Sequence, residues 1–322
     1  MATVIILGGG GFIGSHMVKE MVGEGHTVYA VDVVFPSFRL PQLVGSKKLV
    51  ADLRTDVTRD ILESYQPDYV FQFAADMGGV EYFHSDRDWA ASVNNGLINY
   101  QVLCAVNSLY KQPRLLFTST ACAYATEHQM TAQPANLIEE DIEWGTPDQL
   151  YGLEKRMSAV MYQTAPLDAR VALLHTTYGP FQEYSGIRMK FPSAVCQKAR
   201  ASRTTKKMEL LGDGTQIRSF LYITDAISRL KALMFDWDTD PGFVNVGSDT
   251  PHRIVDVAET VLSLAHSTNN HGVTIEFIGG PMGVRARNSD NTKAKLVFGN
   301  TDGVSMRDGM ARFIEWLDEV KA

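Results

Sequence analysis

The sequence predicts an α/β protein built on a doubly wound parallel sheet, and two observations carry this prediction. Short apolar runs rich in β-branched residues alternate with longer stretches of helical periodicity through the first half of the chain, and a glycine-rich turn directly follows the first run. Strands buried on both faces read as nearly continuous apolar runs, and their alternation with helices requires right-handed crossover connections. The 322 residues, 45% hydrophobic and 21% charged, have the composition of a globular protein.

Six strands and three helices are expected in the first half of the chain. The strands are expected at 3–7, 27–32, 47–50, 69–73, 115–119 and 170–175, and the helices at 12–24, 89–106 and 149–163. Each strand segment is a short apolar run, and each helix segment has apolar residues at helical spacing.

Longer loops separate shorter elements in the second half of the chain. Two apolar segments there, 220–223 and 243–246, are expected to return to the first sheet. Residues 1–175, with returning segments near 220–248, are therefore predicted to form one domain. Residues 176–322 are predicted to form mainly a smaller, discontinuous domain.

The turn GGGGFIGS after the first strand places Gly8, Gly11 and Gly14 at three-residue spacing at the start of a helix. Such a turn brings the backbone close to a pyrophosphate, and the free N–H groups and dipole of the helix N-terminus favour its negative charge. The expected contacts come from these glycines together with Phe12 and Ile13. A glycine-rich loop also occurs as a plain turn, so the prediction of a dinucleotide site depends on the strand and helix around it.

The second strand ends at Asp32, 18 residues after Gly14. A carboxylate there accepts hydrogen bonds from the adenosine ribose and repels a 2′-phosphate, so the predicted cofactor is NAD rather than NADP. The alternative is that Asp32 is only a turn residue at a strand end. We expect three further residues to line the same pocket: Asp52 and Leu53 after the third strand, and Ala74 after the fourth. The alternative for Asp52 and Leu53 is that they lie in a solvated loop.

Charge and cysteine content exclude several other classes of function. A net charge of −7 gives no general attraction to nucleic acid or to anionic membranes, so neither is an expected partner. No apolar run approaches the roughly 20 residues that span a bilayer, and the N-terminus has no leader pattern. The cysteines Cys104, Cys122 and Cys196 form no CxxC pair and the histidines show no ligand spacing, so we expect a cytoplasmic protein without a metal site.

A second group of residues has the pattern of a catalytic centre. The segment LLFTSTACAYA puts Thr120 and Cys122 at the carboxyl end of a strand, and YGLEK places Tyr151 and Lys155 one helical turn apart. The Lys155 ammonium then lies beside the Tyr151 hydroxyl, and its charge, with that of a nicotinamide ring, is expected to lower the tyrosine pKa. A tyrosine in this state can remove a proton from a sugar hydroxyl while hydride leaves the carbon.

Together these motifs resemble the extended short-chain dehydrogenase/reductase family, the NAD-dependent epimerases and dehydratases, along nearly the whole chain. The features that follow the family's order are the glycine turn, Asp32, Thr120, the YxxxK pair, YGP at 178–180 and Arg218 before SFLYITD. The resemblance implies a Rossmann-type doubly wound sheet with a smaller α+β C-terminal substrate domain, a retained NAD, and a nucleoside-diphosphate sugar in the cleft between them. It also implies a homodimer formed through the long helices 89–106 and 149–163.

Within the family, the strings AADMGGV, STACAY, RMKFPSAV, GDGTQIRSF and GVRARNSDN resemble the GDP-mannose 3,5-epimerase subfamily. This resemblance implies GDP-mannose or a close relative as substrate, oxidation at carbon 4, and epimerisation at carbons 3 and/or 5. Inversion at these carbons needs a base on one face of the ring and an acid on the other. By resemblance, Cys122 and Lys190 are this pair, the Cys122 thiolate taking a proton and the Lys190 ammonium returning one. Ala121 and Cys122 stand where dehydratases carry two carboxylates, which disfavours elimination of water.

Substrate contacts are expected around this cleft. Gly78 and Gly79 form a loop where backbone can approach the hexose, and three arginines are expected to neutralise the diphosphate through bidentate hydrogen bonds. The arginines are Arg218, Arg285 and Arg287, and the other expected contacts are Thr176, Lys190, Lys198, Asn288 and Ser289. Surface arginines are usually only solvated, so that reading stays open beside the phosphate clamp.

The chain departs from the family pattern at Leu173, Thr176 and Ala125, where the family usually has Arg, Asn and Pro. Glu81 and His84 are also unusual near a diphosphate. These departures leave another sugar preference open, and the alternatives are a UDP-sugar 4-epimerase or a nucleotide-sugar reductase of the same fold. A non-catalytic NAD-binding sensor is the alternative from a different class.

Overall fold

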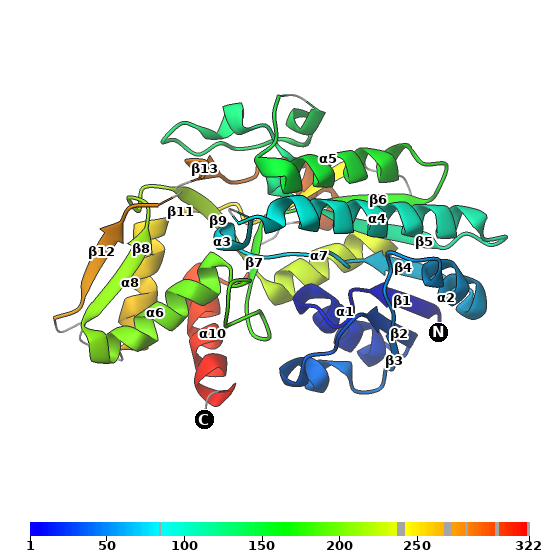
Figure 1. Cartoon of the computed structure of the whole chain (residues 1–322), viewed down its shortest axis with the longest axis horizontal. Coiled ribbons are helices and arrows are strands. Elements are labelled where there is room, and N and C mark those ends of the chain that lie inside the picture. Colours follow the sequence, from blue (N-terminus) through cyan, green and yellow to red (C-terminus); the bar gives the residue numbers. More distant parts are fainter. Residues whose placement is uncertain are drawn as a thin grey trace.

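The computed structural model describes residues 1–83, 85–143, 145–236, 242–266, 272–280, 283–299 and 303–320. Seven of the described strands form a parallel central sheet in the order β10-β6-β5-β4-β1-β2-β3 (Figure 1). They are β1 (Thr3–Leu7), β2 (Thr27–Asp32), β3 (Lys47–Val50), β4 (Tyr69–Gln72), β5 (Arg114–Thr120), β6 (Ala169–Leu174) and β10 (Phe243–Val246). The strand order reverses between β1 and β4, which is the arrangement of a doubly wound Rossmann-type sheet.

Side chains alternate along β1 and show how both faces of this sheet are buried. Val4 and Ile6 belong to an apolar cluster shared with α1 (Phe12–Gly23) and α7 (Ile223–Phe235). Ile5 and Leu7 belong to a second cluster, shared with α2 (Val57–Tyr65), α4 (Arg87–Ser108) and α5 (Gln149–Thr164). All four side chains are fully buried. Helices therefore cover both faces, with α4 and α5 on one side and α1 and α7 on the other (Figure 1).

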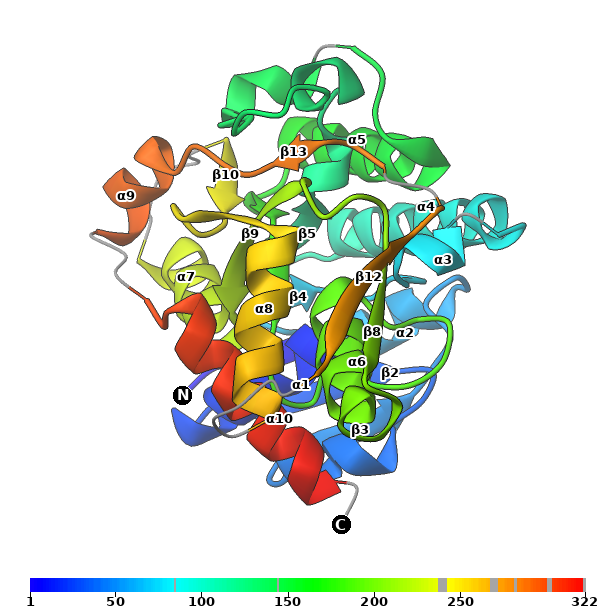
Figure 2. The ribbon, with the colours of Figure 1, turned by 90° about the vertical axis from the view of Figure 1, so that its left-hand side faces the viewer.

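The second half of the chain builds two small sheets beside the main one (Figure 2). The first sheet joins β9 (Ile217–Tyr222) to β7 (Thr176–Tyr178), β11 (Pro251–Arg253) and β13 (Ala286–Arg287), and the second joins β8 (Lys207–Leu211) to β12 (Thr274–Ile278). Three helices pack on one another beside these strands: α6 (Phe191–Thr205), α8 (Ile254–Ala265) and α10 (Met306–Val320).

The remaining described helices are short. They are α3 (Val80–Phe83), α9 (Thr292–Phe298) and the 3₁₀ helices η1 (Ser37–Leu43), η2 (Ala121–Ala123), η3 (Thr126–Gln129) and η4 (Glu139–Glu143). Within the described ranges, no helix combines the length and the apolar character needed to cross a bilayer.

The strands and helices expected in the first half are present, with ends within two residues of the expected ones. Segment 243–246 is β10, which pairs with β6 in the main sheet. The expectation that 220–223 returns to this sheet was wrong, because these residues lie in β9 and at the start of α7. The reason is that β7, which follows β6 in the chain, leaves the main sheet and pairs Thr176 with Phe220. The main-sheet position beside β6 is filled by β10 instead.

Candidate active site

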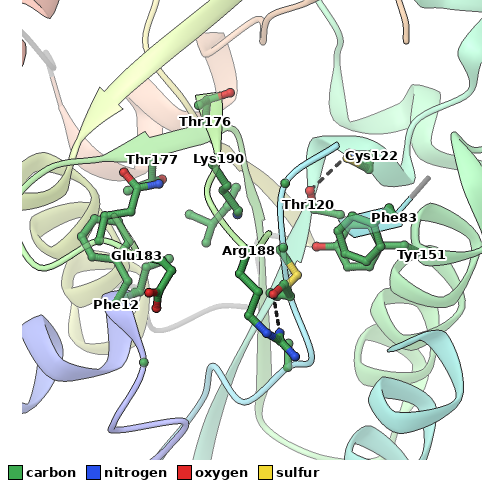
Figure 3. A pocket seen from close by; sticks show the side chains of 18 of the residues that line it. Phe12, Phe83, Thr120, Cys122, Tyr151, Thr176, Thr177, Glu183, Arg188 and Lys190 are labelled. Carbon is green, nitrogen blue, oxygen red and sulfur yellow. Dashed lines mark hydrogen bonds between the residues drawn. The ribbon is translucent and has the colours of Figure 1, made fainter. Parts of the chain in front are cut away.

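The carboxyl ends of the main-sheet strands open into a cavity of about 980 Å³. Its lining comes from the glycine turn before α1, the ends of the central strands, the first turns of α5, the loop before α6, and β9. Ligands of open α/β sheets bind in this position, where the strand order reverses. Figure 3 shows Phe12 on one side of the cavity and Cys122 and Tyr151 on the other, with Lys190 between them.

The glycine turn packs too closely against the sheet for any other residue. A Cβ on Gly8, whose φ is +83°, would lie 2.5 Å from the backbone nitrogen of Ala74, and a Cβ on Gly14 would lie 2.0 Å from the carbonyl oxygen of Gly8. This packing lets α1 begin at Phe12, where the first N–H groups of a helix have no partner within the helix. Gly8, Gly11, Phe12, Ile13 and Gly14 all line the cavity. Their backbone fits the pyrophosphate of a dinucleotide.

The Asp32 carboxylate lies at the end of β2 and lines the same part of the cavity. It accepts hydrogen bonds from the backbone N–H groups of Gly10 (3.0 Å) and Val34 (3.4 Å), and burial raises its pKa. A carboxylate has about four acceptor sites, so sites remain for ribose hydroxyls. The other expected residues that line this end are Asp52, Leu53 and Ala74. Asp52 is held by an ion pair with Arg54 at 2.6 Å.

Thr120 at the end of β5 and Tyr151 and Lys155 on α5 line the cavity together. The Tyr151 ring stacks on Phe83 with centroids 4.4 Å apart, and a hydrogen bond joins its hydroxyl to that of Thr120. Burial raises the pKa of Tyr151 well above its usual value, and burial lowers the pKa of Lys155. The protein's own groups therefore do not produce the expected lowering of the Tyr151 pKa. Burial destabilises the phenolate more than the hydrogen bond to Thr120 stabilises it.

Lys190 precedes the first turn of α6, and its side chain enters the cavity (Figure 3). Enclosure lowers the pKa of Lys190, the charge of Cys122 opposes this, and the charge of Lys155 adds to it. Lys190 is thus close enough to both Cys122 and Lys155 to be influenced by their charges. A lysine with a lowered pKa releases and takes up protons more readily near neutral pH.

Two loops meet over this part of the cavity. A Cβ on Gly79 would lie 2.0 Å from the carbonyl oxygen of the residue before Lys190, so the two chain segments touch. Arg188 ties them together through an ion pair with Asp76 at 2.8 Å and a hydrogen bond to the carbonyl of Met77 at 2.6 Å. The expected substrate residues that line this region are Gly78, Gly79, Thr176, Lys190 and Lys198.

Arg287 lines the cavity, and its guanidinium is anchored to the wall of the site. Its Nε donates to Gln129 Oε1 at 2.6 Å, its Nη2 donates to Asp148 Oδ2 at 2.9 Å, and its Nη1 donates to Cys122 Sγ at 3.0 Å. All three guanidinium nitrogens bond to the protein because β13 places Arg287 against the wall that carries Cys122. A guanidinium has five N–H donors and these contacts use three, so one N–H on each Nη remains for a phosphate oxygen.

Arg218 neighbours Arg287 in the register of β9 and β13 and also lines the cavity. Its guanidinium donates to the carbonyls of Ile217 (2.7 Å) and Val284 (2.8 Å). Burial, together with the charge of Arg287, lowers the pKa of Arg218 to about 9. An enclosed arginine beside another cation is stabilised by an anion, so this wall fits a phosphate group.

Three expected substrate contacts do not line the cavity. Arg285 precedes β13, and its guanidinium lies 3.6 Å from the carboxylate of Asp213. Asn288 is buried, and its side-chain oxygen accepts a hydrogen bond from the N–H of Ala135 at 2.7 Å. Ser289 is only 4% exposed. The chain enters the protein interior after β13, so both residues are enclosed by the protein, and the Asn288 side chain holds the loop at Ala135.

The departures from the family pattern fall into two groups. Leu173 and Ala125 are fully buried, so they act on the site only through packing. Thr176 and Glu81 line the cavity and can act on a ligand directly. His84 lies outside the described residues.

Sequence reasoning missed three residues that shape the site: Phe83, Asp148 and Arg188. Phe83 stacks on Tyr151, Asp148 anchors Arg287, and Arg188 joins the two loops. The available signal was proximity in sequence, because Asp148 comes just before YGLEK and Arg188 just before Lys190. Among the side chains that the structure describes, no group of three His, Cys, Asp or Glu residues is arranged to hold a metal ion.

This fold and site define a class of NAD-dependent enzyme. The chain belongs to the NAD dependent epimerase/dehydratase family, whose model matches residues 4–247. It is 32% identical over 320 residues to GDP-mannose 3,5-epimerase 1 of Oryza sativa subsp. indica, across 98% of this chain and 82% of that protein. It is 28% identical over 320 residues to UDP-glucuronic acid decarboxylase 5 of Arabidopsis thaliana, across 95% and 86% of the two chains.

A solved structure shows the same fold. The UDP-glucose 4-epimerase of Thermotoga maritima superposes with a TM-score of 0.85 at 20% identity, covering 99% of this chain and 100% of that one. The family resemblance, the fold class and the cofactor NAD predicted from the sequence are thereby confirmed.

Proposed function

We propose that the protein is an isomerase that epimerises a nucleoside-diphosphate hexose at carbon 3, carbon 5 or both, with GDP-mannose as substrate. One observation carries the proposal: a single cavity is lined by the pair Tyr151 and Lys155 and by a second pair, Cys122 and Lys190. The first pair suffices for chemistry at carbon 4. The second pair has no task in a simple 4-epimerase, and it supplies the base and the acid that inversion at a neighbouring carbon requires.

The first pair works at the carbon 4 hydroxyl. Tyr151, held between the Phe83 ring and the Thr120 hydroxyl, takes the hydroxyl proton and later returns it. The Lys155 ammonium stabilises the phenolate that forms in the interval. When bound, NAD accepts a hydride from carbon 4 and gives it back, so that this carbon is a ketone in between.

The second pair works on opposite faces of the ring. A ketone acidifies the C–H bonds on both neighbouring carbons. The Cys122 thiolate removes one of these protons, and the electron pair of the broken C–H bond moves to the ketone oxygen as an enolate. The Lys190 ammonium then delivers a proton to the other face of the same carbon, which inverts it. Each inversion leaves Cys122 protonated and Lys190 neutral, so both must exchange protons with solvent, and solvent deuterium must enter the ring.

The choice of GDP-mannose has two supports. The rice relative named GDP-mannose 3,5-epimerase 1 is 32% identical across nearly this whole chain. On the cavity wall, Arg218 and Lys198 are cations placed for a diphosphate. Thr176 and Glu81, where the chain departs from the family, are the residues that would alter the sugar preference.

We also propose a homodimer formed through α4 and α5, which pack against each other. Both helices expose large apolar side chains at intervals of mostly three and four residues, which places them on one face of each helix. The exposed residues are Trp89, Val93, Leu97 and Tyr100 on α4, and Leu150, Leu153, Met157, Val160 and Met161 on α5. Such a patch marks an interface, and a second copy is self-complementary to it. In sedimentation velocity, Leu97→Arg should convert a dimer to a monomer, and an unchanged dimer would contradict this interface.

Compartment and domain roles complete the proposal. We place the protein in the cytoplasm, because all three cysteines are free and a catalytic Cys122 must stay reduced. We assign cofactor binding to residues 1–175 together with α7 and β10, the parts of 220–248 that pack on the main sheet or join it. Residues 176–322 are assigned mainly to the sugar nucleotide.

The test is deuterium exchange during turnover. The purified protein, without added cofactor, is incubated with GDP-mannose in deuterated water, and the sugar is followed by NMR. We expect deuterium at carbons 3 and 5 together with inverted products. Cys122→Ala should lower the exchange rate by about 10²–10⁴-fold, the usual contribution of a positioned acid or base. Cys104→Ala, which removes a thiol on α4 away from the cavity lining, is the matched control.

Other outcomes separate the alternatives. A product inverted at carbon 4 without deuterium would indicate a 4-epimerase, and continuous consumption of added NADH would indicate a reductase. No turnover with a panel of nucleotide sugars, despite NAD in the protein, would indicate a sensor. Full exchange in Cys122→Ala would contradict the role of this cysteine while leaving the activity intact.

A further inference from the structure

We propose that Asp88 is a positioning residue for Tyr151, because its carboxylate fixes the backbone from which the Tyr151 side chain reaches the cavity. The proposal rests on the function proposed above, in which Tyr151 moves the proton of the carbon 4 hydroxyl. A 4-epimerase would use Tyr151 in the same way, so the proposal does not require GDP-mannose as the substrate.

The N-cap residue of α5 does not cap the helix. The side chain of Asp148 makes no capping bond, and it accepts instead from Arg287 Nη2 at 2.9 Å. The first N–H groups of a helix find no partner within the helix, so they need acceptors from elsewhere. The chain also enters α5 through Gln149 with a φ of +62°, a backbone conformation that is unfavourable for a residue with a side chain. The start of α5 therefore needs a contact from outside the helix.

Asp88, in the first turn of α4, supplies this contact. Its Oδ2 accepts a hydrogen bond from the N–H of Leu150 and its Oδ1 accepts one from the N–H of Tyr151, both at 3.1 Å. A carboxylate at a helix N-terminus is stabilised by the helix dipole, and its hydrogen bonds are charge-assisted. One carboxylate thus joins α4 to the start of α5, and one of the two N–H groups that it holds belongs to Tyr151.

The ring and the hydroxyl of Tyr151 are held by other elements. The ring stacks on Phe83, the last residue of α3, with centroids 4.4 Å apart (Figure 3). The hydroxyl forms a hydrogen bond with that of Thr120. These contacts orient the side chain, but the place where it begins depends on the backbone that Asp88 holds. A displacement of about 1 Å in a reacting group can lower a rate by up to about 10²-fold, so this cap matters for proton transfer.

Asp88 acts through position and not through charge. Its carboxylate bonds to the backbone N–H of Tyr151, whereas the phenolic oxygen lies at the far end of the side chain, beside Thr120. The charges that act most strongly on the phenol come from Cys122 and Glu154. Loss of the carboxylate should therefore slow proton transfer at carbon 4 without changing how the sugar nucleotide binds.

The experiment follows the half-reaction at carbon 4. The protein with its bound NAD is mixed with GDP-mannose in a stopped-flow instrument, and the absorbance of NADH reports oxidation of the sugar. The variants are Asp88→Ala, which removes both acceptors, and Asp88→Asn, which keeps one acceptor oxygen. Asp86→Ala is the matched control, because Asp86 is exposed, makes no capping bond and carries the same charge. Without substrate, hydrogen exchange followed by mass spectrometry on peptides that contain Leu150 and Tyr151 reports the cap itself.

In Asp88→Ala, NADH should form about tenfold more slowly, and the half-saturating concentration of the sugar should stay within about twofold. Asp88→Asn should lie between this variant and the wild type. The amides of Leu150 and Tyr151 should exchange faster in both variants, and Asp86→Ala should match the wild type in every measurement.

A wild-type rate of NADH formation in Asp88→Ala, shown to be folded by circular dichroism, would overturn the proposal. Unchanged amide exchange would overturn it as well, because the cap would then be absent in solution. If Asp88→Ala does not fold, Asp88→Asn carries the same test, and a wild-type rate in that variant would overturn the proposal.

A second rate separates positioning from general damage to the site. Cys122 and Lys190 act only after carbon 4 is oxidised. The rate at which deuterium enters the ring, divided by the amount of NADH present, should therefore keep its wild-type value in Asp88→Ala. If this ratio falls together with the rate of NADH formation, the cap only maintains the fold of the site, and the positioning role is wrong.

The choice of sugar separates this proposal from the proposed function. If UDP-glucose but not GDP-mannose reduces the bound NAD, and Asp88→Ala slows that reduction, the proposed substrate fails and the role of Asp88 stands. If GDP-mannose is epimerised and Asp88→Ala keeps the wild-type rate, the proposed function stands and the role of Asp88 fails. If no sugar of a nucleotide-sugar panel reduces the NAD of the wild type, both fail.

Discussion

Lowering the pH from 7.5 to 5 should destabilise the folded protein through two buried histidines. His16 Nε2 lies 3.0 Å from the carbonyl oxygen of Pro180, and His175 Nε2 lies 3.1 Å from Asn245 Oδ1. Burial lowers the pKa of both from 6.5 to about 4. Because this is a depressed folded-state pKa, the unfolded chain binds protons first. The stability contributed by each neutral histidine is complete above pH 6.5 and is lost as the pH falls towards 4.

The size of the loss follows from the two pKa values of each histidine. The difference between 6.5 and about 4 is 2.5 units, which corresponds to roughly 3 kcal/mol when the full window is crossed. At pH 5 about 2 kcal/mol of this is lost for each histidine. With an unfolding entropy of about 2 cal/mol/K per residue, a chain of this length should lose roughly 3 °C in Tm for each histidine.

The assay is thermal unfolding followed by circular dichroism at pH 7.5 and at pH 5. The quantity compared is the fall in Tm between the two values, which should be about 3 °C smaller in His16→Gln and in His175→Gln than in the wild type. Loss of packing lowers Tm at both pH values and cancels in this difference. Asp32 and Glu139, whose pKa burial raises, act in the opposite direction equally in all three proteins. A fall in Tm as large in both variants as in the wild type would refute the reasoning.

Three further changes test the site. Tyr151→Phe should lower turnover by about 10²–10⁴-fold, because it removes the group that moves the proton of the carbon 4 hydroxyl. Turnover is measured by NMR, and a wild-type rate in this variant would exclude Tyr151 from that role. Gly79→Ala should lower kcat at least tenfold, since its Cβ would lie 2.0 Å from the Met189 carbonyl and would displace the loop that carries the acid. Gly23→Ala, where nothing lies within 4 Å, is its control, and equal kcat in the two would contradict the steric argument. Arg285→Gln should leave KM for GDP-mannose within about twofold in initial-rate assays, and a tenfold rise would show that it binds the substrate after all.

The central sheet could be predicted because burial on both faces leaves a strong signal in the sequence. The fully buried residues of β1, Val4 to Leu7, are all apolar, so they read as an uninterrupted run. Segment 220–223 is equally apolar, yet it lies in β9 and α7. An apolar segment indicates that a strand is buried, but it does not indicate which sheet the strand joins. That choice depended on β7, a strand of three residues, too short to predict from its own pattern.

The candidate site shows a similar limit. Residues on consecutive elements of the parallel sheet meet at its carboxyl edge by topology, so Thr120, Cys122, Tyr151 and Lys155 could be expected to gather in one place. Lys190 comes from the loop before α6, and no periodicity in the sequence connects that loop to the sheet. Only the resemblance to a family indicated it.

The two arginines around Ala286 show why contacts within a site could not be read from spacing. Residues two apart in a strand face the same side, so Arg285 and Arg287 suggested one clamp. The strand β13 begins only at Ala286, however, and Arg285 precedes it and turns towards Asp213. Arg287 pairs with Arg218 in the register of β9 and β13, and it contacts Cys122 on the cavity wall. The two arginines therefore differ in the partners that other loops bring to them, Asp213 before β9 for Arg285 and Cys122 after β5 for Arg287, and no pattern in the sequence specifies these partners.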